Sequence, residues 1–268
     1  MLYKFFYYLF SVFPSFKRFF WKKWYTIFAN KVHDIQFMNY GFASENLHVD
    51  LNEEDDCNRY PIYLYHHVAS QVNIENKKIL EIGSGRGGGA SYISRYMNPK
   101  EVIGLDISPS AVKDCNEKYN IDNLSFTLGD SGKLPYDNNT FDAVINVESS
   151  HCYASMSKFI KEVTRVLKPG GHFLFCDLRR NELVEDMLSS IDTNDLRLIN
   201  SMEITQNIIE ATVLMSKDRK ESIGKLKSGF FKRILESFAA VEGSKVHDSF
   251  KDGYLRYFSA CSQKKYDR

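Results

Sequence analysis

A glutamate and a histidine lie just past an apolar run of the chain, in the stretch NVESSHCY at residues 146–153. The run that precedes them, FDAVINV at 141–147, has the length and composition of a buried strand. A titratable side chain at the tip of a strand can exchange a proton with a bound molecule, and histidine, with a reference pKa of about 6.5, suits a general base near neutral pH. His151 is therefore the candidate base. For Glu148 three roles stay open: binding a cofactor's ammonium group, tuning His151, or capping the following helix.

A second acid, Asp177, ends a later apolar run, GHFLFCDL at 171–178. If the two runs are neighbouring strands, Asp177 would orient the imidazole of His151 and stabilise its charged form, as an aspartate does in a hydrolase triad. The alternative is a histidine hydrogen-bonded to a loop backbone, with proximity to a cofactor doing the catalysis. Proximity would suffice for an acceptor that is already acidic or is an amine.

A glycine-rich turn offers a place for a cofactor. Gly83, Gly85 and Gly87 follow the apolar run 77–82 and precede a helical stretch, so the backbone there can turn sharply and approach a ligand closely. Asp106 closes the next apolar run, where an acid can accept hydrogen bonds from ribose hydroxyls. Because glycines 83, 85 and 88 also satisfy G-x-G-x-x-G, spacing alone does not separate a nicotinamide cofactor from an adenosine one.

Short apolar runs alternate with helical stretches over most of the chain. Strands are expected at 77–82, 101–107, 124–130, 141–147 and 171–178, with a closing strand in GYLRYFSACSQK at 253–264, and helices at 88–97, 109–119 and 154–168. The last of these helices ends in LKPGG, a stop signal. This alternation predicts an α/β fold: a Rossmann-like, doubly wound, mostly parallel sheet with helices on both faces. The polar segment 181–240 is expected to be helical and to cover the acceptor side.

Composition excludes several classes of protein. The chain has 268 residues, 43% of them hydrophobic, which suits one substantial core. Its net charge of +1 and pI near 7.6 argue against a nucleic-acid partner. Five scattered cysteines without CxxC spacing argue against a disulfide framework or a zinc site and favour a reducing, cytoplasmic compartment. No cluster of carboxylates and histidines has metal-ligand spacing. His66 and His67 fall on different faces of an expected helix, either as ordinary helix residues or with one lining an acceptor pocket.

The first 32 residues differ from the rest. They hold 14 of the 38 aromatic residues, six Lys or Arg and no acid. The longest charge-free stretch, Phe5 to Phe16, is shorter than the roughly 20 residues that a spanning helix needs. After Pro14, aromatic side chains share one helical face opposite Arg18 and Lys22, which is typical of a helix lying in the headgroup layer of a membrane. Residues 1–35 are therefore expected to associate with a membrane surface. A lid packed over the catalytic domain is the alternative, and the two are compatible.

Four stretches together resemble the successive motifs of class I S-adenosylmethionine-dependent methyltransferases, in order and spacing. They are LEIGSGRGGGASYI, GLDIS, GDSGKLPYDNNTFDAVINVESSHCY and FIKEVTRVLKPGGHFLFCDLR. A closer resemblance, from FMNYGF and NRYPIYLYHHVASQV to the C-terminal strand, is to the phthiotriol/phenolphthiotriol dimycocerosates methyltransferases, which O-methylate a lipid hydroxyl. It implies a seven-stranded sheet in a methyltransferase domain at 76–268, preceded by cap helices at 36–75.

The resemblance also implies a cofactor site for S-adenosylmethionine. Glu81, Gly83, Ser84 and Gly85 would face the methionine part of the cofactor, and Asn146 would lie under its sulfonium end. Asp106 would hold the ribose, and Ile107, Asp130 and Ser131 would contact the adenine. Tyr40 in FMNYGF would close over the cofactor. The pair of His151 and Asp177 resembles the histidine and aspartate of natural-product sugar O-methyltransferases.

The expected function is therefore transfer of a methyl group to oxygen on a hydrophobic, lipid-like or polyketide-like acceptor by a peripheral membrane enzyme. N-methylation of a phospholipid headgroup and C-methylation of a sterol-like lipid are alternatives that share the same cofactor motifs. A cofactor-binding scaffold docked on a membrane is the alternative outside the enzymes. The acceptor's identity and the oligomeric state do not follow from the sequence.

Overall fold

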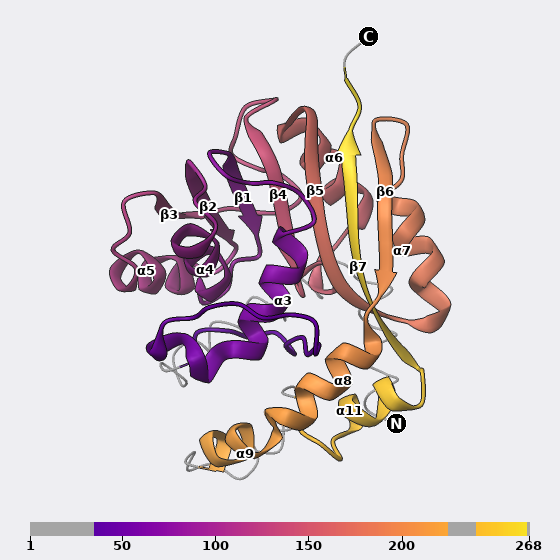
Figure 1. Ribbon diagram of the computed structural model, residues 1–268. Helices are drawn as coiled ribbons and strands as arrows, with labels where there is room; N and C mark the ends of the chain where they lie inside the picture. The colour runs from indigo at the N-terminus through magenta and orange to yellow at the C-terminus, as the bar shows by residue number, and fades with distance from the viewer. Residues whose placement is uncertain (1–34, 225–239, 267–268) are drawn as a thin grey trace.

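The centre of the fold is a seven-stranded sheet with the order β3-β2-β1-β4-β5-β7-β6 (Figure 1). The computed structural model describes residues 35–224 and 240–266. Strands β1 to β5 pair in parallel, whereas β7 is antiparallel to both β5 and β6. The strands are β1 Lys78–Ile82, β2 Glu101–Asp106, β3 Leu124–Leu128, β4 Phe141–Val147, β5 Leu167–Arg180, β6 Leu196–Glu203 and β7 Leu255–Lys264.

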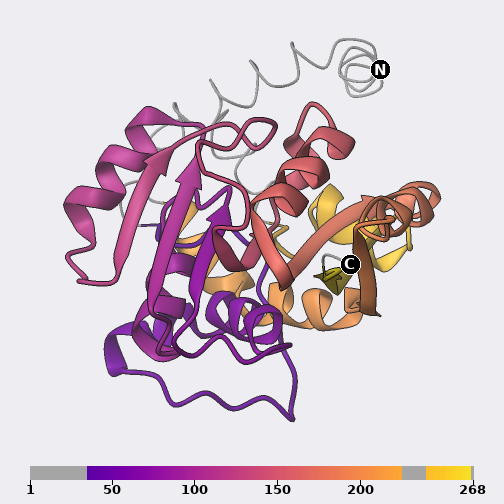
Figure 2. The ribbon, with the colours of Figure 1, turned by 90° about the horizontal axis from the view of Figure 1, so that it is seen from above.

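Helices lie on both sides of this sheet (Figure 2). The α-helices are α3 Arg59–Ala69, α4 Gly88–Tyr96, α5 Pro109–Lys118, α6 Met156–Val166, α7 Val184–Ser190, α8 Thr205–Leu214, α9 Ser216–Gly224 and α11 Lys245–Lys251. Among the described residues, short 3₁₀-helices precede α3, α6 and α7: η1 Glu53–Asn58, η2 Ser150–Cys152 and η3 Asn181–Leu183. This arrangement confirms the predicted α/β, doubly wound fold.

The central strands read as unbroken apolar runs because both faces of the sheet are covered. Successive side chains of a strand point to opposite faces. On β1, Ile79 accordingly joins the core cluster that includes residues of α3 and α4, and Leu80 joins the cluster that includes residues of α6.

Helix starts follow ordinary capping chemistry. Ser108 caps α5 by accepting the Ala111 N–H, with Pro109 in the first turn, and Ser155 caps α6 by accepting the Lys158 N–H. Because α6 is strongly amphipathic, it buries an apolar stripe that includes Phe159 against the sheet.

Two expectations about the helical parts need correction. The segment 181–240, expected to be helical, contains strand β6, which pairs with β7 at the edge of the sheet. Residues 199–203 of β6 are exposed, so this strand lacks the apolar run that marks a buried one. Within 36–75, helices form only at 53–69, and residues 35–52 run without regular secondary structure.

The carboxyl ends of the parallel strands meet at the lower edge of the sheet in Figure 1, and helices α8 and α11 lie below it. In open α/β sheets ligands bind at this edge. Across the described ranges, none of the helices is long and apolar enough to cross a membrane. The expected membrane-associating segment lies outside these ranges, apart from Ile35.

Candidate active site

The turn after β1 requires its glycines. The backbone is left-handed at Gly83, Gly85 and Gly87, with φ of +80°, +52° and +77°, a conformation that residues with a side chain rarely adopt. Gly83 also has no room for a side chain, because a Cβ there would lie 2.4 Å from Ser149 Oγ. The glycine pattern read from the sequence thus reflects both backbone conformation and close packing.

Asp106 lies at the end of β2, beside this turn. One carboxylate oxygen accepts the Gly85 N–H at 2.9 Å and the other accepts the Ser108 N–H at 2.8 Å. Burial raises the pKa of Asp106, and these N–H donors oppose the rise. Asp106 therefore shapes the glycine-rich turn, a contact that the sequence did not predict. The half-buried Ile107 follows it.

Asp130 and Ser131 follow β3 at the same edge. The Gly129 N–H donates to the Asp106 carbonyl at 2.9 Å, which holds the start of this loop beside β2. Asp130 turns the loop by accepting the Gly132 N–H at 3.0 Å, and both Asp130 and Ser131 are half-buried. The fold thus brings these two residues next to Asp106.

Glu81 is fully buried on β1. Its Oε1 accepts a hydrogen bond of 2.7 Å from the Tyr65 hydroxyl. Burial raises the pKa of Glu81 to about 7, although Tyr65 and the Ala90 N–H oppose this rise. Within the described part of the chain, neither Glu81 Oε2 nor the buried Ser84 Oγ has a hydrogen-bond partner.

Asn146 is buried near the tip of β4, in a network that the sequence did not reveal. Its Nδ2 lies 2.8 Å from the Ile82 carbonyl, 2.7 Å from Ser149 Oγ and 2.9 Å from the Tyr153 hydroxyl. Its Oδ1 has no partner among residues 35–224 and 240–266. The sequence does not predict that Ser149 and Tyr153 belong to this network, because only the fold of η2 between them turns both hydroxyls toward the Ile82 carbonyl of β1. Their position in NVESSHCY, beside His151, is the signal that points to them.

The predicted pair of His151 and Asp177 is formed. His151 lies in η2, and its Nδ1 is 2.8 Å from Oδ1 of the fully buried Asp177. The His151 backbone N–H donates to Asp177 Oδ2 at 2.9 Å, and the Ser150 hydroxyl donates to the same oxygen. Arg179 Nη1 lies 3.1 Å from Oδ2, and the Leu178 N–H donates to Oδ1. This set of donors fixes the carboxylate and so orients the imidazole.

The charges of the pair reinforce each other. Burial by itself would raise the pKa of Asp177, but His151 and Arg179 hold it well below its usual range. Burial would lower the pKa of His151, but Cys152 and the Asp177 carboxylate raise it to about 10. The fold therefore raises the pKa of His151 above the reference value that the sequence suggested.

Tyr40 reaches the same edge from the N-terminal side. Glu148 Oε1 accepts the Tyr40 backbone N–H at 2.7 Å, and the Tyr40 ring packs edge-on against Phe250 with centroids 5.5 Å apart. Burial and Glu148 raise the pKa of the Tyr40 hydroxyl. Burial also raises the pKa of Glu148 to about 7, although the Tyr40 N–H opposes this. The structure thus gives Glu148 a partner that none of its three expected roles includes.

The two adjacent histidines of α3 make different contacts. His66 Nδ1 lies 2.6 Å from the Tyr92 hydroxyl of α4, and the His67 ring stacks on Phe42 with centroids 4.5 Å apart. Both contacts join α3 to neighbouring segments, so both histidines have packing roles.

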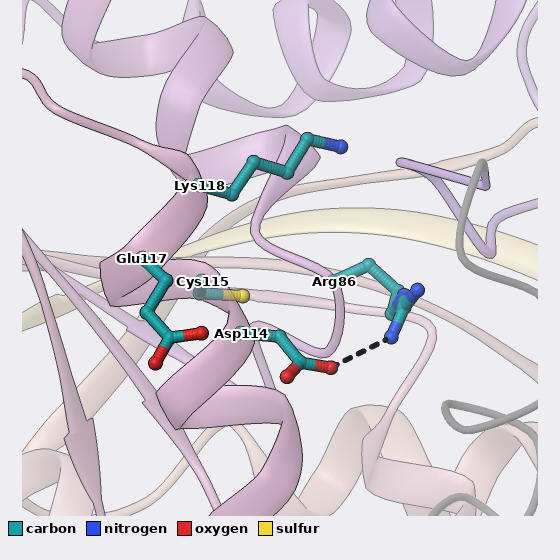
Figure 3. Close-up of a pocket in the computed structure, with 5 residues that line it drawn as sticks. All are labelled: Arg86, Asp114, Cys115, Glu117 and Lys118. Carbon is teal, nitrogen blue, oxygen red and sulfur yellow. Dashed lines mark hydrogen bonds and ion pairs between the residues drawn. The ribbon is translucent and has the colours of Figure 1, made fainter.

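A cavity of about 280 Å³ lies behind the glycine-rich turn, between Arg86 and α5 (Figure 3). Arg86 Nη1 is 3.5 Å from Asp114 Oδ2, and Cys115, Glu117 and Lys118 complete the lining. These residues all differ from those expected to hold the cofactor or the acceptor.

Unpartnered polar atoms gather where the methionine part of the cofactor is expected. Glu81 Oε2, Ser84 Oγ and Asn146 Oδ1 are all buried. A buried polar group without a partner costs about 1–3 kcal/mol. An ammonium group donates hydrogen bonds to oxygens of this kind. The residues present therefore fit the expected cofactor.

Residues 80–175 match a family model described as a methyltransferase domain. Over 240 residues the chain is 34% identical to the phthiotriol/phenolphthiotriol dimycocerosates methyltransferase of Mycobacterium leprae, which covers 88% of this chain and 89% of that relative. Over 180 residues it is 39% identical to the fatty-acid O-methyltransferase of Mycolicibacterium smegmatis, covering 67% and 66% of the two chains.

A solved structure shares the fold. The geranyl diphosphate C-methyltransferase of Streptomyces coelicolor A3(2) aligns with a TM-score of 0.62 and 16% identity, over 84% of this chain and 90% of that one. At this identity the likeness supports the fold alone. Family membership rests on the sequence relatives: the chain belongs to the class I S-adenosylmethionine-dependent methyltransferases and, within them, to the phthiotriol/phenolphthiotriol dimycocerosates methyltransferase family, enzymes related to lipid O-methyltransferases.

Proposed function

We propose that this enzyme methylates an oxygen atom of a hydrophobic, lipid-like or polyketide-like acceptor at a membrane surface. The observation that carries the proposal is the contact between His151 and Asp177 at the carboxyl edge of the sheet, where the glycine-rich turn also lies. S-adenosylmethionine supplies, when bound, an electrophilic methyl group. An aliphatic hydroxyl must lose its proton to attack such a carbon, so a hydroxyl acceptor needs a base at this edge.

The hydrogen bond to Asp177 determines which ring nitrogen of His151 acts as the base. An ionised carboxylate only accepts, so His151 Nδ1 carries a hydrogen toward Asp177. In the neutral ring, Nε2 is then the basic nitrogen and takes the proton of the acceptor hydroxyl. Asp177 stabilises the imidazolium that results, since its own carboxylate is held by Arg179 and Ser150.

The cofactor would be held as the resemblance implies. The glycine-rich turn, with Glu81 and Ser84, would take the methionine part, and Asp106 the ribose. Asn146 would lie near the reacting centre and Tyr40 above it. The unpartnered oxygens of Glu81, Ser84 and Asn146 support this assignment.

A hydrophobic acceptor is supported by the relatives, one named for phthiotriol dimycocerosates and the other for fatty acids. Membrane action is supported by the aromatic and cationic residues 1–32, which lie outside the described residues. It is also supported by Val213 and Leu214 at the end of α8, which are 41% and 50% exposed. These apolar side chains lie on an element below the carboxyl edge of the sheet (Figure 1).

A carboxylate acceptor is the second candidate. It needs no base, and an imidazolium would attract it. The raised pKa of His151 favours this candidate, because the ring then carries a positive charge at neutral pH. Its product would be a methyl ester, whereas a hydroxyl acceptor would give a methyl ether.

The test is to incubate the protein and methyl-labelled cofactor with a total lipid extract and to identify the labelled product by mass spectrometry. An ether or an ester supports O-methylation, and mild alkali separates the two because it releases only the ester's methyl group. An N-methylated headgroup or a C-methylated lipid would contradict the proposal, and no label in any lipid would favour the scaffold. His151→Ala with the same extract is the control for transfer by the site.

A further inference from the structure

Residues 35–43, here called the covering segment, lie over the glycine-rich turn. A Cβ added at Gly85 would be 2.5 Å from Met38 Cε, and one at Gly88 would be 2.6 Å from the Gln36 carbonyl. Arg86 Nε donates to the Ile35 carbonyl at 3.3 Å. The turn expected to bind the cofactor is therefore in direct contact with this segment.

Backbone hydrogen bonds fix the far end of the covering segment to helices. The Phe42 N–H donates to the Tyr60 carbonyl at 3.0 Å, and the Ala43 N–H donates to the Asn207 carbonyl at 3.2 Å. These bonds join it to α3 and α8. The part of the covering segment that lies over the glycine-rich turn must therefore be held by other contacts.

The side chains of Glu148 and Arg219 hold the middle of the covering segment. Glu148 Oε1 accepts the Tyr40 N–H at 2.7 Å, and Arg219 Nη2 of α9 donates to the Asn39 carbonyl at 2.9 Å. The bond to Glu148 spans 108 positions of sequence and joins the covering segment to the tip of β4.

The backbone of Glu148 is itself unusual. Its φ is +48°, a left-handed conformation that is unfavourable for a residue with a side chain. Its N–H donates to the Cys176 carbonyl of β5 at 2.8 Å, which anchors the residue to the sheet. The carboxylate therefore projects from a rigid, strained position toward Tyr40.

We propose that Glu148 is a positioning residue that holds the covering segment closed over the glycine-rich turn and thereby slows entry and exit of the cofactor. The inference rests on the glycine-rich turn being the cofactor site. Since Met38 and Gln36 pack on that turn, the cofactor exchanges only when the segment moves away. The Tyr40 N–H contact must break for this movement.

The first test uses the full-length, ligand-free protein and chymotrypsin, which cleaves after aromatic residues. Cleavage after Phe37 and Tyr40, followed by mass spectrometry of the fragments, reports opening of the covering segment. Glu148→Ala should be cut at these bonds about tenfold faster than wild type, the ratio expected from losing one hydrogen bond of about 1.4 kcal/mol. Glu148→Gln keeps an oxygen acceptor and should stay within about threefold of wild type. Glu75→Ala, at an exposed glutamate, is the matched control.

The second test measures binding and release of S-adenosylhomocysteine by stopped-flow. For Glu148→Ala both rate constants should rise, so that the dissociation constant changes less than the dissociation rate. A residue with only a structural role would lower the melting temperature and the affinity without faster association.

Two outcomes would overturn the proposal: cleavage and release of Glu148→Ala at wild-type rates, or a Glu148→Gln variant that opens as fast as Glu148→Ala. If wild-type protein fails to bind S-adenosylhomocysteine, the assumed cofactor site is wrong, and the cleavage rates alone decide whether Glu148 holds the segment.

Discussion

Asp177 Oδ1 and His151 Nδ1 lie 2.8 Å apart, although 26 positions separate the two residues in the chain. The parallel pairing of β4 with β5 brings them together, since Asp177 ends the apolar part of β5 and His151 follows β4 by one short turn. The carboxylate is fully buried, whereas 27% of the imidazole is exposed. The buried carboxylate of Asp177 thus holds an imidazole ring that is partly exposed.

Removing the base should stop the chemistry and spare binding. His151→Ala should lower the single-turnover rate of methyl transfer to a hydroxyl acceptor by a factor of about 100 to 10,000, because general base catalysis contributes that much. Cofactor affinity should stay near normal. Asp177→Asn should cause a similar loss. The double variant should lose much less than the product of the two factors, because the residues act as one unit.

The control for these variants is His247→Ala, at a buried histidine of α11. It should change stability more than the rate of methyl transfer. A His151→Ala enzyme within threefold of wild type, or independent multiplicative effects, would show that the histidine is structural.

The pH profile separates the two candidate acceptors. Only neutral imidazole accepts a proton, so with a hydroxyl acceptor the rate should rise with pH through the raised pKa of His151, well above 6.5. With a carboxylate acceptor held by the imidazolium, the rate should instead fall as pH rises through that pKa. Asp177→Asn removes the neighbouring charge and should move either midpoint to lower pH. A profile that is flat between pH 6 and 10 in both proteins would contradict both mechanisms.

Asp106→Ala should weaken binding of S-adenosylmethionine by about 1.5 to 3 kcal/mol, the usual range for hydrogen bonds with a charged partner. The loss has two sources, because Asp106 would bind the ribose and also holds the Gly85 N–H of the turn. Calorimetry measures this change in the binding free energy of S-adenosylmethionine. Asp106→Asn keeps one acceptor oxygen and should lose less; unchanged affinity in Asp106→Ala would remove this residue from the cofactor site.

Gly83 and Gly243 form a matched pair, since both have φ of +80° but only Gly83 is crowded. Gly243→Ala should cost about 1 kcal/mol of unfolding free energy from backbone strain alone. Gly83→Ala should cost about 1–3 kcal/mol more, because the new Cβ meets Ser149 and Tyr153. Urea unfolding of both variants gives the difference. Equal costs would show that Ser149 moves aside freely.

Deleting residues 1–30 should leave a folded protein that no longer sediments with anionic liposomes. Binding of the full-length protein should weaken as salt rises, because the five cations in this stretch are expected to face anionic lipid. A full-length variant with Lys17, Arg18, Lys22 and Lys23 changed to Gln separates charge from aromatic insertion. If the deletion unfolds the domain and the full-length protein never binds liposomes, the lid alternative holds.

The sequence by itself determined the elements whose signals are local. The apolar runs place β1 to β5 and β7 within a few residues, with β5 starting earlier, at Leu167. The helical stretches place α5 and α6 within two residues at each end. The glycine positions follow from the backbone of a single turn, and the pair of His151 and Asp177 follows from the rule that parallel strands end at one edge.

The tertiary structure decided the contacts between distant segments. Polar β6 forms a strand because β7 offers it an antiparallel partner, which no local pattern reveals. Glu148 meets Tyr40, and Arg219 meets Asn39, because the folded covering segment contacts both the tip of β4 and α9. The pKa of His151 rises above its reference value because the fold places Cys152 and the Asp177 carboxylate beside it, and their effect outweighs that of burial. Hydrogen bonds and charge interactions act through distance in space, and the folded chain sets those distances.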